Sequence, residues 1–354
     1  MPDILITRDG SDLDSELAEL ARPIVAKWQA AILRVAAAQV EPAKFAIPPD
    51  KDSPEQILAR RFRMLPESRR VRSGARAVEL LAQKNRTQNL RRFINLDFSG
   101  ASSVDQLSKT KSNGSLTKQR VTALVKARFA DLGVTPSTSV TFPYKLLQLS
   151  LIRVRCVDET NGFLGSESGD DEIELGGSGI DESGDISKIE SFKAGDFSDG
   201  DVKNFSPPRK LVAFNVNEGA DYPKSYFAIL ILNESDMGNF SETMDEIIKK
   251  LKNEVTAKLL ALLGAKFGAS GGPIGALIGL LVGYAVGKIF DFLIVAWEDD
   301  PFKPQTIEVV IPSADATQTV LRNVGASQVV IFKGPGEYAL RYAWTLSQER
   351  LTRA

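Results

Sequence analysis

The stretch "GAKFGASGGPIGALIGLLVGYAVGKIFDFL", residues 264–293, decides how this sequence is interpreted. It contains no charged residue between Phe267 and Gly287, and its glycines recur mostly at every fourth position. These glycines are Gly264, Gly268, Gly272, Gly275, Gly279, Gly283 and Gly287. A glycine inside a helix costs about 1 kcal/mol relative to alanine, so a series in one register predicts a compensating close approach to a second backbone.

A helical hairpin is predicted around this stretch, over residues 241–290. Its first helix begins at Ser241, which can cap free backbone N–H groups. An apolar stripe follows from Met244 to Leu263, opposite a lysine-rich face. The segment "GASGGP" is the turn, and Pro273 suits the first position of the second helix. We expect the glycine face of one helix to pack against that of the other.

The second helix is apolar on all sides, which is typical of helices that are deeply buried or lie in lipid. Fifteen residues run from Pro273 to Gly287 before Lys288 and Asp291 add charge, whereas a full membrane span needs roughly 20. A conditionally inserted hairpin and a hairpin enclosed by a soluble domain both stay open. The glycine-spaced hydrophobic hairpin resembles those of pore-forming bacteriocins and toxins, and that resemblance implies a membrane-insertion element.

The chain has an α+β multi-domain pattern. Helical periodicity over 11–41, 54–94 and 116–133 predicts a helical region at 1–135, with a polar linker near 97–117. From residue 144 short β-branched and aromatic runs predict an antiparallel β-sandwich at 144–349, into which the hairpin is inserted. The strand candidates are "LLQLSLIRVRCVDE", "DEIELGG", "RKLVAFNV", "SYFAILILNE", "FLIVAWEDD", "QTIEVVIPS", "SQVVIFKG" and "EYALRYAWTLS". The glycine-rich and acidic stretch "GSESGDDEIELGGSGIDESGDISKIESFKAGDFSDGD" also reads as a loop.

Acidic clusters lie at the ends of several predicted strands. Carboxylates on neighbouring loops are the ligands that calcium prefers, so these residues form a candidate calcium site: Asp158, Asp171, Glu172, Asp236 and Asp299. The arrangement is similar to that of C2 domains, which would imply calcium bound at one end of an eight-stranded sandwich. The alternative is that these are ordinary soluble turns, since Asp and Gly dominate turns for backbone reasons.

Charge is segregated along the chain. Residues 55–92 contain eleven Lys and Arg against three Asp and Glu, whereas residues 151–201 contain fourteen Asp and Glu against four Lys and Arg. The basic region predicts a docking patch of Arg60, Arg61, Arg69, Arg70 and Arg72. We expect it to dock on the acidic region of the same chain or of a second copy. Phosphate binding is the alternative, but aromatic residues are too few there for a nucleic-acid platform.

Composition restricts the chemistry. The sequence contains no histidine, which excludes Ser-His-Asp and Cys-His catalysis and histidine-bound zinc. Its single cysteine, Cys156, cannot form an intramolecular disulfide. The N-terminal residues lack the basic and apolar regions of a classical signal peptide. We therefore expect a cytoplasmic protein, or one released by a dedicated export system.

The sequence thus predicts a non-enzymatic membrane-active or membrane-docking protein, toxin- or effector-like, with the hairpin as its insertion element. The alternative is a soluble structural or protein-binding sandwich, with or without calcium, whose hairpin is core. An enzyme using loop carboxylates such as Asp171 and Glu172 is a third class, which would need an acid–base pair in a pocket. The expected partners are membrane lipid or protein, including a second copy of the chain.

Overall fold

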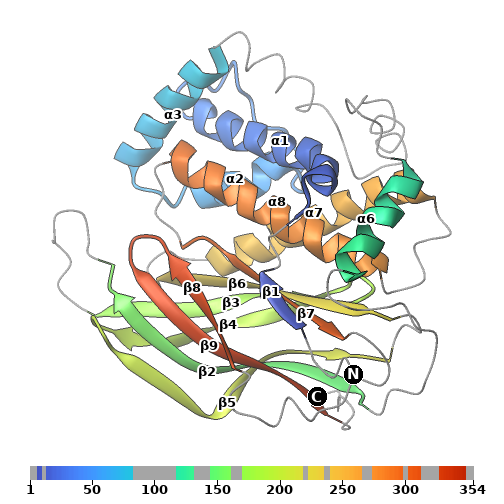
Figure 1. Ribbon diagram of the computed structural model, residues 1–354. Coiled ribbons are helices and arrows are strands. Elements are labelled where there is room, and N and C mark those ends of the chain that lie inside the picture. Colours follow the sequence, from blue (N-terminus) through green and yellow to red (C-terminus); the bar gives the residue numbers. More distant parts are fainter. Residues whose placement is uncertain are drawn as a thin grey trace.

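The structure is a computed structural model. It describes residues 6–9, 13–82, 117–130, 144–160, 170–217, 222–234, 240–264, 273–297, 302–311 and 327–347. In these segments a layer of helices covers one face of a five-stranded sheet, and a four-stranded sheet lies on its other side (Figure 1).

The five-stranded sheet is antiparallel, with the strand order β1-β7-β6-β3-β4. Its strands are β1 (Ile6–Asp9), β3 (Asp171–Ile180), β4 (Ile186–Phe197), β6 (Lys224–Glu234) and β7 (Gln305–Ile311). Strand β6 is buried along almost its whole length. Its continuous apolar run suits a strand that is covered on both faces.

The four-stranded sheet is also antiparallel, with the order β5-β2-β9-β8. Its strands are β2 (Leu146–Asp158), β5 (Val202–Asn215), β8 (Gln328–Lys333) and β9 (Glu337–Ser347). Leu149 and Trp344 of this sheet join Leu230 and Val309 of the other in one buried cluster. Side chains alternate between the two faces of a strand, so every second residue of β9 points away from this core. The same alternation in β2 is interrupted by an irregularity between Leu151 and Arg153.

The helical layer contains α1 (Ser15–Ala38), α2 (Pro54–Phe62), α3 (Glu67–Ala82), α6 (Lys118–Ala130), α7 (Phe240–Leu263) and α8 (Pro273–Trp297). Local signals start two of these helices. The Asp14 side chain accepts a hydrogen bond from the N–H of Glu16 at 2.8 Å, and Ser53 Oγ accepts one from the N–H of Gln56 at 3.2 Å. Such caps each stabilise a helix by about 1 kcal/mol.

Helix α8 lies at the centre of this layer, in contact with α1, α3, α7 and strand β6. Its apolar side chains share one core with Trp28 of α1 and Phe227 of β6. At its C-terminal end, Trp297 Nε1 donates to the backbone oxygen of Ile32 at 3.1 Å. Ser73 Oγ donates to the backbone oxygen of Trp297 at 2.9 Å. The C-terminal turn of α8 is therefore held by both α1 and α3.

The predicted fold class is confirmed as a mixed α+β protein with two antiparallel sheets. The strand prediction for "FLIVAWEDD" is wrong, because residues 292–297 are the last turns of α8. A run of aromatic and β-branched residues favours a strand locally, but here burial among helices overrides that preference.

The loop prediction for the glycine-rich acidic stretch is also wrong, because this stretch contains all of β3 and β4. The predicted strand "DEIELGG" lies within β3. Strand β4 lies at the sheet edge and exposes many polar side chains. Its sequence is therefore hard to recognise as that of a strand. Strand β1, which pairs with β7, adds a strand to the region that was expected to be helical.

The division into domains at 1–135 and 144–349 stays a prediction. Residues 131–143, and nearly all of the linker expected near 97–117, lie outside the described residues. Helices from both predicted parts, α1 and α8, pack in one layer (Figure 1). Helix α7 begins at Phe240, one residue before the predicted start.

Candidate functional site

The glycine face of α8 lies against the five-stranded sheet. A Cβ at Gly275 would stand 1.6 Å from the backbone oxygen of Glu182, and a Cβ at Gly279 would stand 2.1 Å from the ring of Phe227. Neither position has room for a methyl group. The helix backbone therefore touches β6 and the turn after β3 only because these side chains are missing.

The space around the glycines of α8 increases toward the C-terminal half of the helix. A Cβ at Gly283 would lie 2.7 Å from Cγ2 of Thr306. A Cβ at Gly287 would lie 3.8 Å from Cε of Lys303, which is ordinary van der Waals contact. The spatial need for glycine is therefore greatest at the N-terminal end of the helix.

The predicted packing of one glycine face against another is wrong for α8, because the atoms nearest to its glycines belong to the sheet side of the molecule. Gly264 follows α7 with a φ of +88°, and an added Cβ there would meet nothing within 4 Å. It therefore ends α7 in the way that glycine commonly ends helices. Gly268 and Gly272 lie outside the described residues.

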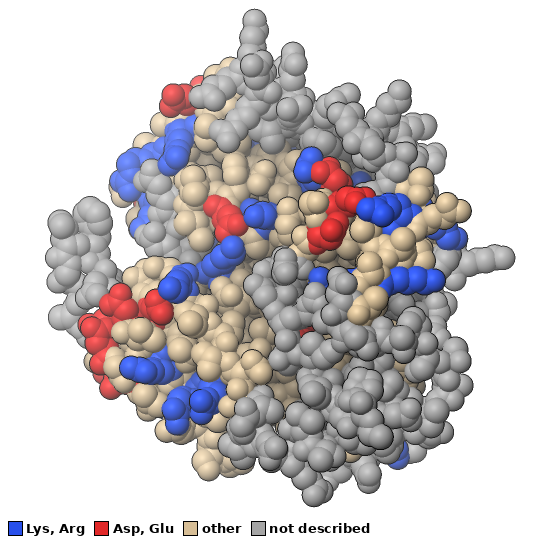
Figure 2. All heavy atoms as spheres, viewed as in Figure 1, with Lys and Arg blue, Asp and Glu red and all other residues tan. Residues whose placement is uncertain are grey.

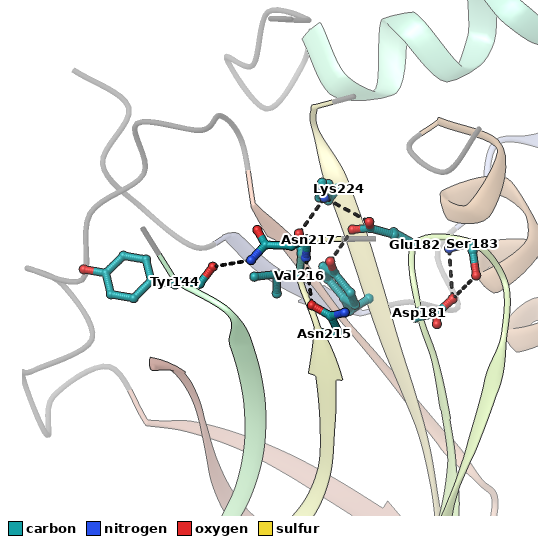
Figure 3. A network of polar contacts seen from close by, with 9 residues as sticks. Tyr144, Asp181, Glu182, Ser183, Asn215, Val216, Asn217 and Lys224 are labelled. Atoms are coloured by element: carbon teal, nitrogen blue, oxygen red, sulfur yellow. Dashed lines mark hydrogen bonds and ion pairs between the residues drawn. The ribbon is translucent and has the colours of Figure 1, made fainter. Parts of the chain in front are cut away.

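A buried polar network lies at this N-terminal end (Figure 3). Lys224 Nζ donates to Glu182 Oε1 at 2.9 Å and to the backbone oxygen of Val216 at 2.6 Å. The Tyr226 hydroxyl donates to the other carboxylate oxygen of Glu182. Burial, and then the Glu182 charge, raise the pKa of Tyr226 well above its usual range, so the phenol stays a donor. Lys224 and Glu182 are each 1% exposed. The hydrogen-bond partners named above for these two residues all lie inside the protein.

Local hydrogen bonds shape the turn that presents Glu182. The Asp181 carboxylate accepts the N–H of Ser183 at 2.9 Å and the N–H of Asp185 at 2.8 Å. This is the turn chemistry for which aspartate is favoured. The turn directs the Glu182 side chain into the network and its carbonyl toward Gly275. The network and the glycine contact are therefore one structural unit.

Two further ion pairs join elements that are distant in sequence. Glu254 of α7 accepts from Lys27 Nζ at 2.7 Å and from Trp28 Nε1 at 3.1 Å, both of α1. Burial raises the pKa of Glu254, and the Lys27 charge opposes that rise. Arg128 of α6 lies 2.8 Å from the carboxylate of Glu308 on β7. The first pair joins helix α1 to helix α7, and the second joins helix α6 to the five-stranded sheet.

Carboxylates do gather at one end of the sheets, where β2 ends and β3 begins. Asp171 is 8% exposed and accepts hydrogen bonds from Thr160 N at 2.7 Å and from the Tyr338 hydroxyl at 2.5 Å. Burial, and then the neighbouring carboxylates led by Asp199, raise the pKa of Glu159. Asp171 therefore accepts hydrogen bonds from protein donors and links the segment after β2 to strand β9.

The other candidate calcium ligands are placed less favourably. Asp158 is exposed, and Glu172 lies 3.2 Å from the ammonium of Lys193. Asp236 and Asp299 fall outside the described residues. Among the residues that the structure describes, no group of three or more suitable side chains is arranged to hold a metal ion. Calcium binding stays a prediction.

The predicted basic patch spans α2 and α3. Arg60 forms an ion pair with Glu246 of α7, which lies outside the acidic region where its partner was expected. Arg61 is 4% exposed. The remaining residues are half-buried or exposed: Arg69, Arg70 and Arg72. Part of the predicted patch therefore makes contacts inside the protein, and the rest lies wholly or partly at the surface.

Sequence reasoning missed the Glu182–Lys224–Tyr226 network. Glu182 lies in the turn after β3, far in sequence from Lys224 and Tyr226 on β6. Only the apolar neighbours of Lys224 and Tyr226 hinted that these polar groups would be buried. No protein family, curated protein or solved structure matches this chain.

Proposed function

We propose that this chain is a non-enzymatic docking protein: a β-sandwich with an inserted helical hairpin that stays in the core, while the outside of the scaffold binds the target. One observation carries the proposal. Gly275 and Gly279 of α8 lie against Glu182 and Phe227 with no room for a Cβ, as expected of a permanent contact.

The surroundings of the hairpin support this proposal. Helices α7 and α8 lie in sequence between β6 and β7, which pair with each other in the sheet. Ser178 of β3 donates to Asp245 of α7 at 3.1 Å, and both residues are buried. Removing the hairpin from the sheet would break this bond and expose the apolar core beneath it, at about 25 cal/mol for each Å² uncovered.

Residue chemistry supports a non-enzymatic role. The sequence contains no histidine, the side chain most often used as a general acid or base near neutral pH. Asp171, the most buried of the candidate carboxylates that the structure describes, is held by Thr160 and Tyr338. The hydrogen bonds that Asp171 accepts from Thr160 and Tyr338 give this carboxylate a structural role.

A disulfide lock between α8 and β7 tests the proposal. A Cβ at Gly283 would lie 3.3 Å from Cβ of Thr306, close to the roughly 3.5–4.5 Å that disulfides span. The variant is Gly283→Cys with Thr306→Cys in a Cys156→Ala background. We expect the oxidised and reduced forms to bind the target equally, because the hairpin does not move. The matched control is the same protein without the Thr306 substitution.

Membrane insertion of the hairpin is the second candidate function, and α8 itself supplies the observation that favours it. Its residues Gly275–Trp297 have a mean hydropathy of 1.9 and suit a membrane span by length and composition, although 61% of that window is buried inside the protein. Dye leakage from vesicles decides between the two. Leakage in the reduced form that is absent in the oxidised form would replace our proposal with insertion.

A further inference from the structure

The outward face of the four-stranded sheet has an unusual composition. Val154 of β2 and Leu340 of β9 point into the core, so their sequence neighbours point outward. Strand pairing aligns these neighbours in two rows across all four strands. The first row is Val202, Arg155, Ala339 and Ile331, and the second is Asn204, Arg153, Arg341 and Val329. Neither row contains an acidic residue.

The arginines of this face lie beside one another. Arg153 of β2 is directly opposite Arg341 of β9, and Arg155 follows two residues along β2. Like charges directly opposite on neighbouring strands destabilise a sheet. Arg153 Nε donates to Asn204 Oδ1 at 2.7 Å, which is a neutral partner. An anion placed over this face would relieve the repulsion between the arginines.

Apolar side chains lie between and beside these charges. Val329 is 52% exposed and Ile331 is 44% exposed, both on β8, while Val202 of β5 is 47% exposed. Val157, at the end of β2, is 43% exposed. The face therefore combines aliphatic groups with arginines on a sheet surface. In Figure 2, basic side chains lie at the lower left of the molecule, next to a group of acidic ones.

We infer that this face docks the protein on an anionic phospholipid surface. The inference rests on the proposed function and names its target. Guanidinium groups match phosphate geometry, and basic side chains near an anionic bilayer each add attraction. The aliphatic side chains between them suit the boundary between headgroups and acyl chains. The arginines supply the charge complement that selects an anionic surface over a neutral one.

The acidic end of the sheets sets the orientation of the bound protein. Asp158 and Glu159 directly follow the outward-facing Val157. Asp199 accepts the N–H of Glu159 at 2.7 Å, so these carboxylates lie together beside the first row. They would be repelled by an anionic surface, and we expect the protein to tilt with this end away from the lipid.

Co-sedimentation with vesicles tests the inference on the full chain. The probes are vesicles of phosphatidylcholine with phosphatidylserine, and vesicles of phosphatidylcholine alone. We expect binding to the anionic vesicles only, weakened by added salt. The variant Arg153→Gln, Arg155→Gln, Arg341→Gln should weaken binding by about fivefold for each arginine removed. Val329→Thr with Ile331→Thr should also weaken it, while leaving the charge unchanged.

A charge-matched control separates this face from a general effect of net charge. Lys51, Arg63 and Lys126 are exposed on the helical side of the molecule. Their replacement by glutamine removes the same charge and should leave binding almost unchanged. Equal loss in both triple variants would overturn the inference. Vesicle binding that soluble glycerol phosphate abolishes would also overturn it, by pointing to a site for free phosphate.

Two further outcomes distinguish this inference from the proposed function. If the disulfide-locked protein binds no vesicles whether oxidised or reduced, the lipid inference is wrong and the docking function stands. If only the reduced form binds and the arginine variant binds normally, the docking function itself is wrong. Salt-sensitive dimerisation without vesicle binding, lost in the arginine variant, would replace the lipid surface by a second copy of the chain.

Discussion

The backbone oxygen of Glu182 occupies the position that a side chain at Gly275 would need, since a Cβ there would stand 1.6 Å from it. The same Glu182 pairs with Lys224 through its carboxylate at 2.9 Å. One residue of a turn thus determines both the closest helix approach in α8 and a buried charge pair in the sheet. The stability of the hairpin against the sheet is expected to depend on this residue.

Replacing Gly275 by alanine should lower the free energy of unfolding by about 3 kcal/mol, because the overlap is with backbone, which cannot rotate away. Urea unfolding followed by circular dichroism measures this change. Gly287 is the matched control. A Cβ there meets only Lys303 at 3.8 Å, so Gly287→Ala should raise stability by about 0.5–1 kcal/mol. Equal effects at both positions would contradict the glycine contact described here.

Replacing Lys224 by methionine should cost about 3–5 kcal/mol, because the Glu182 charge would be left buried without its partner. Adding Glu182→Gln should restore part of that loss, since the amide is neutral and still accepts from Tyr226. The double-mutant cycle measures the coupling between the two residues. Additive losses would show that the pair is not coupled.

Replacing Asp171 by asparagine should destabilise the protein by about 2 kcal/mol, because Thr160 and Tyr338 would lose a charged acceptor. The loss should be the same with and without millimolar calcium, measured as the melting temperature. A wild-type melting temperature that rises with calcium, and a variant in which it does not, would instead place Asp171 in a calcium site.

Lys258 of α7 gives a prediction for pH dependence. Burial lowers its pKa to about 8, whereas the unfolded chain keeps it near 10.5. Between these two pH values the unfolded state binds more protons than the folded state. This residue therefore makes stability rise as pH increases from about 8 to 10.5, and that contribution is lost as pH falls back through the folded pKa of about 8. Unfolding free energies from pH 8 to 10 should rise less in Lys258→Met than in wild type. Identical pH profiles would contradict a lowered pKa for this half-buried lysine.

The fold was predictable where neighbouring residues decide it. Asp14 and Ser53 start α1 and α2 by hydrogen bonds within one turn, and the alternation in β9 follows its burial. The last turns of α8 were not predictable, because "FLIVAW" is apolar without a period and suits a strand or a helix equally. Strand β4 was missed because an edge strand with exposed polar residues resembles a loop.

By itself, the sequence predicted a close backbone contact along Gly275, Gly279, Gly283 and Gly287, because only a close approach offsets the cost of glycine inside a helix. Only the tertiary structure decided that the contact is with Glu182, Phe227 and Thr306. Those residues come from three elements whose proximity depends on strand order. The same holds for the outward arginines, since Arg153 and Arg341 become neighbours only when β2 pairs with β9. Register between distant strands is set by packing of the whole core, which no local pattern encodes.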